Sequence, residues 1–288
     1  MGIVSWESDM KSLLDIMDWT ESEYNELFIM IDKLIAEDNY FPLNKKSVVL
    51  FFPDTSIRTR MTFELGIKKF GGEIISFTDS TLDKKEDIED VVKYIQNWTD
   101  VAIVRHNEFN VLEAMDKHSN IPIINAMTSK NHPCEIIHDL YAIKKIRGDF
   151  TKLKFLYIGP KTNIGYSWYQ SSQKFGFKLT QVCPIGYDIA DKSEYFNITR
   201  DLDEVISDAD IIITDTIIDT DEYIQKYQID YNKIKSMKKD SIFNPTPPFY
   251  RGGVISDDLD LNNTTFAGYD FKKHLLEVQV GIICKCLL

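Results

Sequence analysis

The sequence predicts two parallel-sheet α/β domains linked by an interdomain helix. At 288 residues the chain is longer than the about 100 to 200 residues usual for one domain. Short apolar runs alternate with segments of helical periodicity, in two series that meet near Gly148. Runs that are apolar on both faces are typical of central strands covered by helices, and strands alternating with helices pair in parallel.

The first series begins with a helix that the sequence predicts to start at Thr20. Thr20 can cap the amide of Glu23 while Glu23 reaches back, which is a capping box, and apolar residues recur behind it at helical spacing. The elements expected next are a strand over 47–52, a helix over 61–70, a strand over 73–77, a helix over 88–99, strands over 101–105 and 121–125, and a helix over 133–146.

The second series predicts four strands and a closing helix. The strands are expected over 154–158, 178–183, 211–214 and 241–243, and the helix over 272–287. We therefore expect one domain over 1–147, a second over 148–271, and the helix at 272–288 packed back on the first. In open parallel sheets ligands bind at the carboxyl ends of the strands, so functional residues are expected there.

Charge and composition exclude several classes of function. Lys and Arg number 33 against 45 Asp and Glu, a net charge of −12 that argues against nucleic acid or an anionic membrane as partner. An anionic small substrate stays possible, because a few arginines in a cleft outweigh distant acids. No apolar run reaches the about 18 residues of a membrane span. Four cysteines and a start without a basic segment predict reduced thiols and a cytoplasmic protein.

The sharpest local signal follows the predicted strand 47–52. Ser56, Arg58 and Thr59 lie where the chain leaves that strand and enters a helix. Amides at a helix N-terminus bind anions, hydroxyls add donors, and a guanidinium matches phosphate oxygens. The alternative is a capped helix with two solvated arginines. The Gly-rich P-loop pattern is absent, so hydrolysis of nucleoside triphosphates is not indicated.

Two further polar segments follow strands of the same predicted sheet. Arg105 and His106 end the strand over 101–105, and His132 to Glu135 follow the strand over 121–125. A lone histidine is more often structural than catalytic. Because the carboxyl ends of parallel strands meet at one edge, these residues are expected to converge with Arg58, which favours a site.

These segments resemble the aspartate and ornithine carbamoyltransferases. The run from Ser56 to Arg60 resembles the family's Ser-x-Arg-Thr-Arg motif for carbamoyl phosphate, and His132-Pro-Cys-Glu135 resembles its His-Pro-x-Gln. The run from Lys85 to Asp90 and the segment around Arg105 are also similar. The resemblance extends over nearly the whole chain and is most specific in the first domain.

The resemblance implies transfer of a carbamoyl group from carbamoyl phosphate to an amine, without a metal or organic cofactor. Arg58, Thr59, Arg105 and His132 would act in catalysis, with Thr59 and His132 donating to the carbonyl oxygen. Such a donor contributes about 2.7–4 kcal/mol in the transition state. The implied donor-binding residues are Ser56, Ile57, Arg58, Thr59, Lys85, Arg105, His132 and Glu135. In some members the segment matched by Lys84 and Lys85 comes from a neighbouring subunit, which implies a homotrimer with shared active sites.

The second domain differs more from the family. The implied acceptor-binding residues are Asn163, Asp215, Asp219, Thr220, Asn244, Pro245 and Thr246. No Lys or Arg occurs between Thr214 and Gln225, and Glu135 stands where the family usually has Gln. This wall of carboxylates predicts a cationic, ornithine-like acceptor rather than aspartate, because an ammonium group would be held by charge-assisted hydrogen bonds. The alternative is that both aspartates cap a helix and face solvent.

Three other interpretations stay open at this stage. The altered residues at Glu135, Asp219 and Asn244 are compatible with a catalytically silent paralogue that serves as an assembly or regulatory subunit. A transferase for another acyl phosphate is a further alternative. Glu135 and His138 have the spacing of a metal-ligand pair on one helix face, although the chain has no second such pair.

Overall fold

A computed structural model describes residues 11–287 except 217, 219 and 262–265. The contacts within the chain divide it into two units: residues 1–141 with 274–288, and residues 142–273. The division falls inside helix α5 (Pro133–Arg147), earlier than the domain boundary expected at Gly148. Each unit contains one parallel sheet, so the predicted fold class is confirmed.

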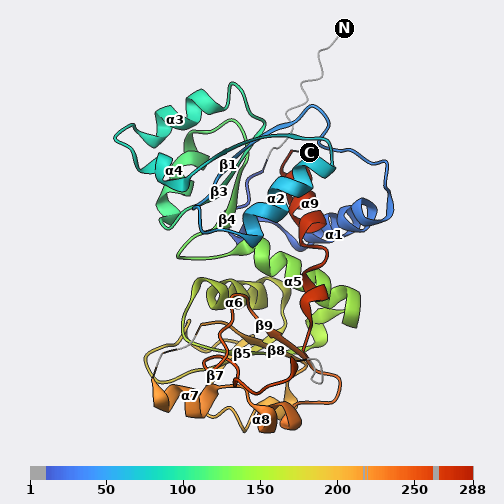
Figure 1. Cartoon of the computed structure of the whole chain (residues 1–288), viewed down its shortest axis with the longest axis vertical. Coiled ribbons are helices and arrows are strands. Elements are labelled where there is room, and N and C mark those ends of the chain that lie inside the picture. Colours follow the sequence, from blue (N-terminus) through green and yellow to red (C-terminus); the bar gives the residue numbers. More distant parts are fainter. Residues whose placement is uncertain (1–10, 217, 219, 262–265, 288) are drawn as a thin grey trace. The chain divides into compact units, whose positions relative to one another are not determined.

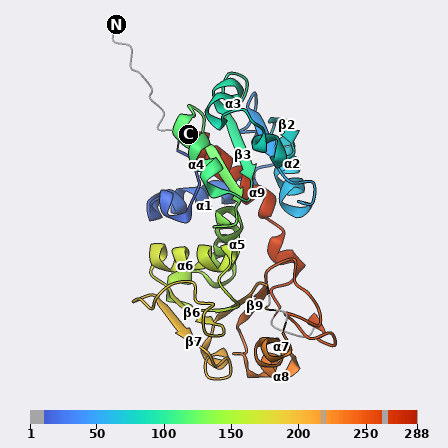
Figure 2. The ribbon, with the colours of Figure 1, turned by 90° about the vertical axis from the view of Figure 1, so that its left-hand side faces the viewer.

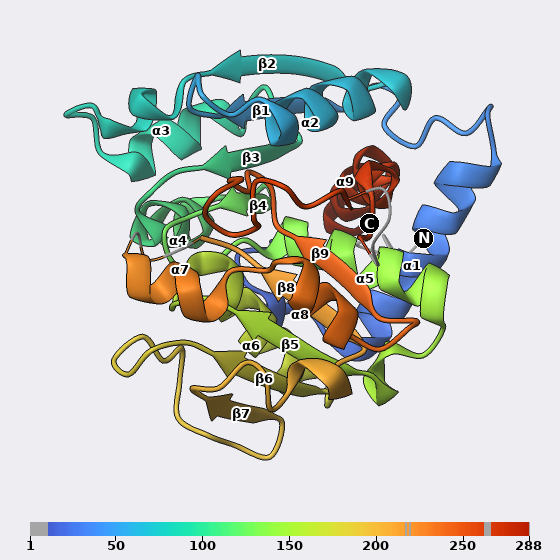
Figure 3. The same cartoon turned by 60° about the horizontal axis from the view of Figure 1, so that its bottom comes forward.

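The sheet of the first unit has the strand order β2-β1-β3-β4, and all its pairs are parallel (Figure 3). Its strands are β1 Ser47–Phe51, β2 Glu73–Phe77, β3 Val101–Arg105 and β4 Ile123–Met127. The two central strands are buried over almost their whole length, as their continuous apolar sequences predict. Strand β2 lies at the edge and alternates between exposed and half-buried residues.

Helices cover both faces of this sheet. They are α1 Glu21–Ala36, α2 Arg58–Lys69, α3 Ile88–Ile95, α4 Phe109–His118, the first part of α5, and α9 Leu275–Leu287. Figure 1 shows α3 and α4 on one side and α1, α2 and α9 on the other. Helix α9 packs on α1 and α2, so the last helix of the chain belongs to the first unit.

Local signals account for several helix boundaries. The capping box before α1 is confirmed: the Thr20 hydroxyl accepts from the Glu23 amide at 3.3 Å, and the Thr20 amide donates to the Glu23 carboxylate at 2.6 Å. Helix α2 begins at Arg58, earlier than predicted, and α3 ends at Ile95 instead of continuing to 99. The Asn97 amide group donates to the carbonyls of Lys93 and Tyr94, which closes the end of α3.

The second unit contains a five-stranded parallel sheet in the order β7-β6-β5-β8-β9. Its strands are β5 Lys154–Ile158, β6 Lys178–Val182, β7 Phe196–Thr199, β8 Ile211–Thr214 and β9 Ile242–Pro245. The prediction that 211–214 is the third strand of this sheet is wrong, because β7 precedes it in the chain. Strand β7 is short and lies at the sheet edge, where its half-exposed side chains leave a weak apolar pattern.

The helices of the second unit lie on both faces of its sheet. They are α6 Asn163–Phe175, α7 Asp221–Tyr227 and α8 Tyr231–Ser236. Figure 2 shows α6 on one side of the strands and α7 and α8 on the other. All four cysteines of the chain are free and buried. No helix in the described part of the chain is long and apolar enough to cross a membrane.

Candidate functional site

In the first unit, residues from two neighbouring strand ends meet at Arg105. The Arg105 guanidinium donates to the Ser56 hydroxyl at 3.1 Å and lies 3.5 Å from the Thr59 hydroxyl. Strands β1 and β3 are paired in parallel, so the turn after β1 and the end of β3 reach the same sheet edge. Ser56 and Thr59 are both buried, so their hydroxyls contact the guanidinium in a site that is largely shielded from water.

The start of α2 adds backbone donors to this group. Its N-cap is Ile57, whose side chain forms no capping hydrogen bond and is 71% exposed. The first-turn amides of a helix have no partner within the helix, and an uncapped start leaves them for an external anion. Arg58 is exposed, whereas Arg60 is bound to the Glu64 carboxylate at 2.8 Å. Arg60 therefore braces α2, and Arg58 is the arginine of this turn suited to a ligand.

Three charged side chains act on the Arg105 guanidinium. Burial lowers the pKa of Arg105, the Glu135 carboxylate opposes that change, and the Arg58 charge adds to it. Asp79, in the short helix Asp79–Asp83, also favours the charged form. The guanidinium thus stands among one other cation and two acids, and the cluster brings together Arg58, Arg105 and Glu135 as the sequence predicts.

His132 and Glu135 lie at the start of α5, and both are buried. The carboxylate of Glu135 is close enough to act on the charge of Arg105. His138 faces a different partner. Its Nδ1 lies 2.9 Å from the carboxylate of Asp139, and both side chains are fully buried. Across the described residues no group of three or more His, Cys, Asp or Glu side chains is placed to hold a metal ion.

Lys85 is exposed on the segment between Asp83 and α3. That segment is held at one end by His106, whose Nε2 lies 2.9 Å from the Asp83 carboxylate. The Glu108 amide donates to His106 Nδ1 at 3.1 Å, so Nε2 carries the proton that reaches Asp83. His106 is therefore a structural clamp next to Arg105.

In the second unit, the predicted acceptor residues lie at the carboxyl ends of β5, β8 and β9. Asn163 is the first residue of α6, and its side-chain oxygen accepts from the Ile164 amide at 2.8 Å. Thr162 caps the same helix and also bonds to the buried Tyr157 hydroxyl at 2.9 Å. The loop is therefore fixed against β5.

Asp215 follows β8 directly and is half-buried. Burial raises the pKa of Tyr157 and of Tyr223, and the negative charge of Asp215 raises both further. Helix α7 is capped by Thr220, which accepts from the Tyr223 amide at 3.3 Å. The alternative that Asp215 caps this helix is thereby wrong. Asp219 lies outside the described residues.

Asn244, Pro245 and Thr246 are buried at the end of β9. The Thr246 amide donates to the Thr214 carbonyl at 2.8 Å, which ties the ends of β9 and β8 together. The hydroxyl oxygens of Thr214 and Thr246 are both buried without a hydrogen-bond partner among the described residues. Unsatisfied buried hydroxyls are costly. Thr246 is one of the predicted acceptor-binding residues, and Thr214 directly precedes another, Asp215.

Comparison with known proteins assigns both units. The family description "Aspartate/ornithine carbamoyltransferase, carbamoyl-P binding domain" matches residues 11–145, and "Aspartate/ornithine carbamoyltransferase, Asp/Orn binding domain" matches 151–283. The chain belongs to the aspartate/ornithine carbamoyltransferase family. A relative named ornithine carbamoyltransferase, from Methanosphaera stadtmanae, is 30% identical over 95% of this chain and 98% of its own length. Another of that name, from Syntrophus aciditrophicus, is 28% identical with the same coverage.

Solved structures of carbamoyltransferases share the fold. The ornithine carbamoyltransferase from Burkholderia thailandensis E264 has a TM-score of 0.88, with 24% identity over 96% of this chain and 99% of that chain. The enzyme of the same name from Pyrococcus furiosus has a TM-score of 0.85, with 22% identity over 95% and 96%.

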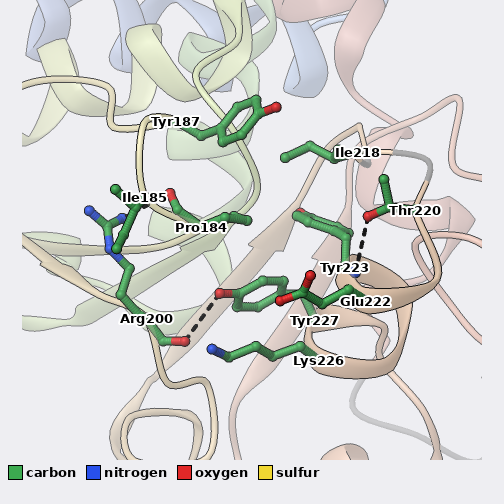
Figure 4. A pocket seen from close by; sticks show the side chains of 10 residues that line it. All are labelled: Pro184, Ile185, Tyr187, Arg200, Ile218, Thr220, Glu222, Tyr223, Lys226 and Tyr227. Carbon is green, nitrogen blue, oxygen red and sulfur yellow. Dashed lines mark hydrogen bonds between the residues drawn. The ribbon is translucent and has the colours of Figure 1, made fainter.

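One feature of this family member was not predicted from the sequence. A pocket of about 470 Å³ lies in the second unit beside α7, and Thr220 is one of its lining residues (Figure 4). Its floor contains Tyr223 and Tyr227, whose spacing of four residues was a detectable signal for one helix face. The opposite wall comes from the loop after β6, which carries no recognisable motif.

Proposed function

We propose that this chain transfers the carbamoyl group of carbamoyl phosphate to an amine of ornithine or a closely similar diamino acid. The observation that carries the proposal is the Arg105 guanidinium bound to the hydroxyls of Ser56 and Thr59 at the start of α2. A cation, two hydroxyls and the uncapped amides of α2 together match the oxygens of the phosphate group of an acyl phosphate.

In the proposed reaction Ser56, Arg58 and the first amides of α2 hold the phosphate, and Arg105 bridges the phosphate and the carbonyl oxygen. Thr59 and His132 donate to that carbonyl oxygen. The amine nitrogen then attacks the carbonyl carbon with its lone pair, and the oxygen gains negative charge that the donors stabilise. The bond from carbon to the phosphate oxygen breaks as the carbonyl re-forms. Phosphate leaves with the bonding electrons and accepts the proton that the nitrogen loses.

The charge of the second unit supports a cationic acceptor. Asp215 is half-buried beside Tyr157 and Tyr223, where a carboxylate is stabilised by pairing with an ammonium group. Asn163 and Thr220 offer polar groups for the carboxylate and amine of an amino acid, and Asp219, Asn244, Pro245 and Thr246 complete the proposed acceptor residues. The names of the relatives from Methanosphaera and Syntrophus support ornithine itself.

A turnover panel tests this function. Carbamoyl phosphate is offered with ornithine, shorter and longer diamino acids, simple diamines and aspartate, and phosphate release is measured. Ornithine or a near homologue is expected to be the best acceptor, with aspartate inert. Efficient carbamoylation of aspartate would contradict the charge argument, and equal turnover of acetyl phosphate would contradict the assignment of the donor.

Binding measured by calorimetry separates the donor site from turnover. Arg58→Ala is expected to abolish carbamoyl phosphate binding without unfolding the chain, because Arg58 is exposed and supports no core packing. Lys68→Ala, which removes an exposed lysine from the other end of α2, is the matched control and is expected to bind normally. A wild-type protein that binds the donor yet turns over no amine would be a silent paralogue instead.

We propose further that the active form is a homotrimer in which Lys85 serves the site of a neighbouring copy. One face of α2 exposes Ile57, Met61 and Leu65, spaced by four residues, and the edge strand β2 exposes Ile75 and Phe77 beside it. Apolar side chains gathered in this way favour burial against another protein. A second copy is the partner that fits, since Lys85 is exposed and so is free to reach a neighbouring chain.

A further inference from the structure

The pocket beside α7 lies where an open parallel sheet offers its ligand crevice. It is formed by the loop after β6, the end of β7, the segment after β8, and α7 itself. Its volume of about 470 Å³ is in the range of small-molecule sites. Loops at the carboxyl ends of parallel strands are the usual place for ligands in such folds. The pocket is therefore large enough and suitably placed for a metabolite.

The floor of the pocket is aromatic and rigid. Tyr223 and Tyr227 are 4% and 3% exposed, and their ring centroids lie 4.9 Å apart at an interplanar angle of 50°. The Tyr227 hydroxyl donates to the Arg200 carbonyl at 3.2 Å, which fixes the ring against the end of β7 (Figure 4). A floor of this kind binds flat or branched apolar groups with little loss of side-chain entropy.

The wall opposite α7 is also held in place. The Arg200 guanidinium makes two hydrogen bonds to the Asp188 carboxylate, at 2.5 and 2.8 Å, and donates to the Pro184 carbonyl at 3.2 Å. The positive charge of Arg200 is therefore matched within the wall. Between these anchors Ile185 is 83% exposed and Tyr187 is 42% exposed. The wall thus presents apolar surface that a ligand would remove from water.

Two further charges stand on α7, one helical turn apart. Glu222 and Lys226 are exposed and line the pocket, and the Lys226 ammonium lies 5.5 Å from the centre of the Tyr227 ring. Figure 4 shows both side chains beside the two tyrosine rings. One carboxylate and one ammonium next to an aromatic floor complement a molecule that carries both charges and an apolar group.

We propose that this pocket is a second ligand site, which binds a free amino acid with a large apolar side chain. The side chain lies on Tyr223 and Tyr227 and against Ile185, the ammonium group pairs with Glu222, and the carboxylate pairs with Lys226. Ile218 and Thr220 line the same pocket, and Thr220 belongs to the segment proposed to contact the acceptor. Occupancy therefore changes the KM for the acceptor and leaves the KM for carbamoyl phosphate unchanged.

Titration calorimetry with L-phenylalanine tests the site without any need for turnover. The comparison ligands are 3-phenylpropanoate, which lacks the ammonium group, 2-phenylethylamine, which lacks the carboxylate, and glycine, which lacks the side chain. L-Phenylalanine is expected to bind best, each phenyl compound about threefold to fivefold more weakly, as for exposed ion pairs, and glycine not at all.

Charge variants assign the two ion pairs. Lys226→Gln should weaken the binding of L-phenylalanine to the affinity of 2-phenylethylamine, and it should not change the affinity for 2-phenylethylamine itself. Glu222→Gln should weaken the binding of L-phenylalanine to the affinity of 3-phenylpropanoate, and it should not change the affinity for 3-phenylpropanoate. Lys235→Gln is the matched control, because Lys235 also lies over a tyrosine ring, that of Tyr231, on a helix outside the pocket. The control is expected to bind L-phenylalanine like the wild type.

Three outcomes would overturn the proposal: no binding of L-phenylalanine, equal binding of glycine, or equal effects of Lys226→Gln and Lys235→Gln. Arg58→Ala separates this site from the proposed transferase function. It is expected to bind L-phenylalanine normally while failing to bind carbamoyl phosphate. A wild-type protein without transferase activity that still binds L-phenylalanine in this pattern would leave the second site standing.

Discussion

Arg105 owes its position to two hydroxyls that lie one helical turn apart. Ser56 and Thr59 hold its guanidinium at the start of α2, while Arg58 and Glu135 set the charge around it. Glu135 is the unusual member, because it is a buried acid beside a site proposed for a dianion. Its negative charge would repel the phosphate and attract the Arg105 guanidinium.

We expect Glu135→Gln to bind carbamoyl phosphate more tightly than the wild type, by about threefold to tenfold. Even at the dielectric constant of bulk water, removing one charge about 4 Å from a phosphate charge relieves repulsion of about 1 kcal/mol. Calorimetry at low salt measures the change. Glu113→Gln, which alters an exposed acid on α4, is the control and should not change the affinity. Weaker binding by Glu135→Gln would mean that the carboxylate holds Arg105 in place.

At the scale of elements, α1 shows how a local signal and a distant partner combine. The Glu23 carboxylate accepts from the Thr20 amide and from the Lys11 ammonium, at 2.6 and 3.0 Å. Burial alone raises the pKa of Glu23, but these hydrogen bonds outweigh it and hold the pKa at about 2, below the ordinary 4.5. The group therefore stabilises the fold above about pH 4.5, and this stabilisation is lost as the pH falls toward 2.

Glu23→Gln is expected to lower the free energy of unfolding by about 1 kcal/mol at pH 7, as is typical of a weakened helix cap. Because the native carboxylate is itself protonated in acid, the difference from the wild type should shrink below about pH 4.5 and disappear as the pH falls through about 2. Urea unfolding at several pH values measures both. Glu21→Gln, in the same helical turn and exposed, should show no such pH dependence. A difference that persists in acid would assign the effect to packing.

The contact between α9 and α1 depends on a residue without a side chain. A Cβ atom at Gly281 would lie 2.8 Å from Cγ1 of Ile31 and 3.1 Å from Cδ1 of Leu27. We expect Gly281→Ala to destabilise the chain by about 1–3 kcal/mol, since overpacking displaces neighbouring side chains. Thermal unfolding measures the loss. In an Ile31→Ala background, Gly281→Ala should lower the free energy of unfolding by a smaller amount, because the side chain that it would displace is gone. If the losses from the two substitutions were strictly additive, the contact between α9 and Ile31 would not be the cause.

For the whole molecule, the prediction concerns assembly. If Lys85 serves a neighbouring copy, the mass in solution should be about three times 33.4 kDa. Lys85→Ala and Arg58→Ala should each be inactive, and mixing them under conditions that exchange subunits should restore activity, because some shared sites receive both intact residues. Light scattering and phosphate release provide the two measurements. A fully active monomer would contradict the shared site.

The sequence by itself determined most element types and the local part of the proposed carbamoyl phosphate site. The capping box at Thr20 and the turn from Ser56 to Arg58 depend on residues within a few positions of one another, and backbone geometry links such residues directly. The buried central strands were equally predictable, since a strand covered on both faces must be apolar along its length. The resemblance to the family also rested on local motifs, chiefly Ser56 to Arg60 and His132 to Glu135.

The tertiary structure decided which residues that are distant in sequence lie in contact. Arg105 meets the Ser56 hydroxyl across 49 residues of sequence, and the contact exists because β1 and β3 are neighbours in a sheet whose strand order no local pattern encodes. The edge strand β7 was missed because half-exposed strands carry little periodic signal. The pocket beside α7 arises from four separate segments, each unremarkable alone. Local propensity is a property of neighbours in the chain, whereas a site depends on packing between residues that are distant in sequence.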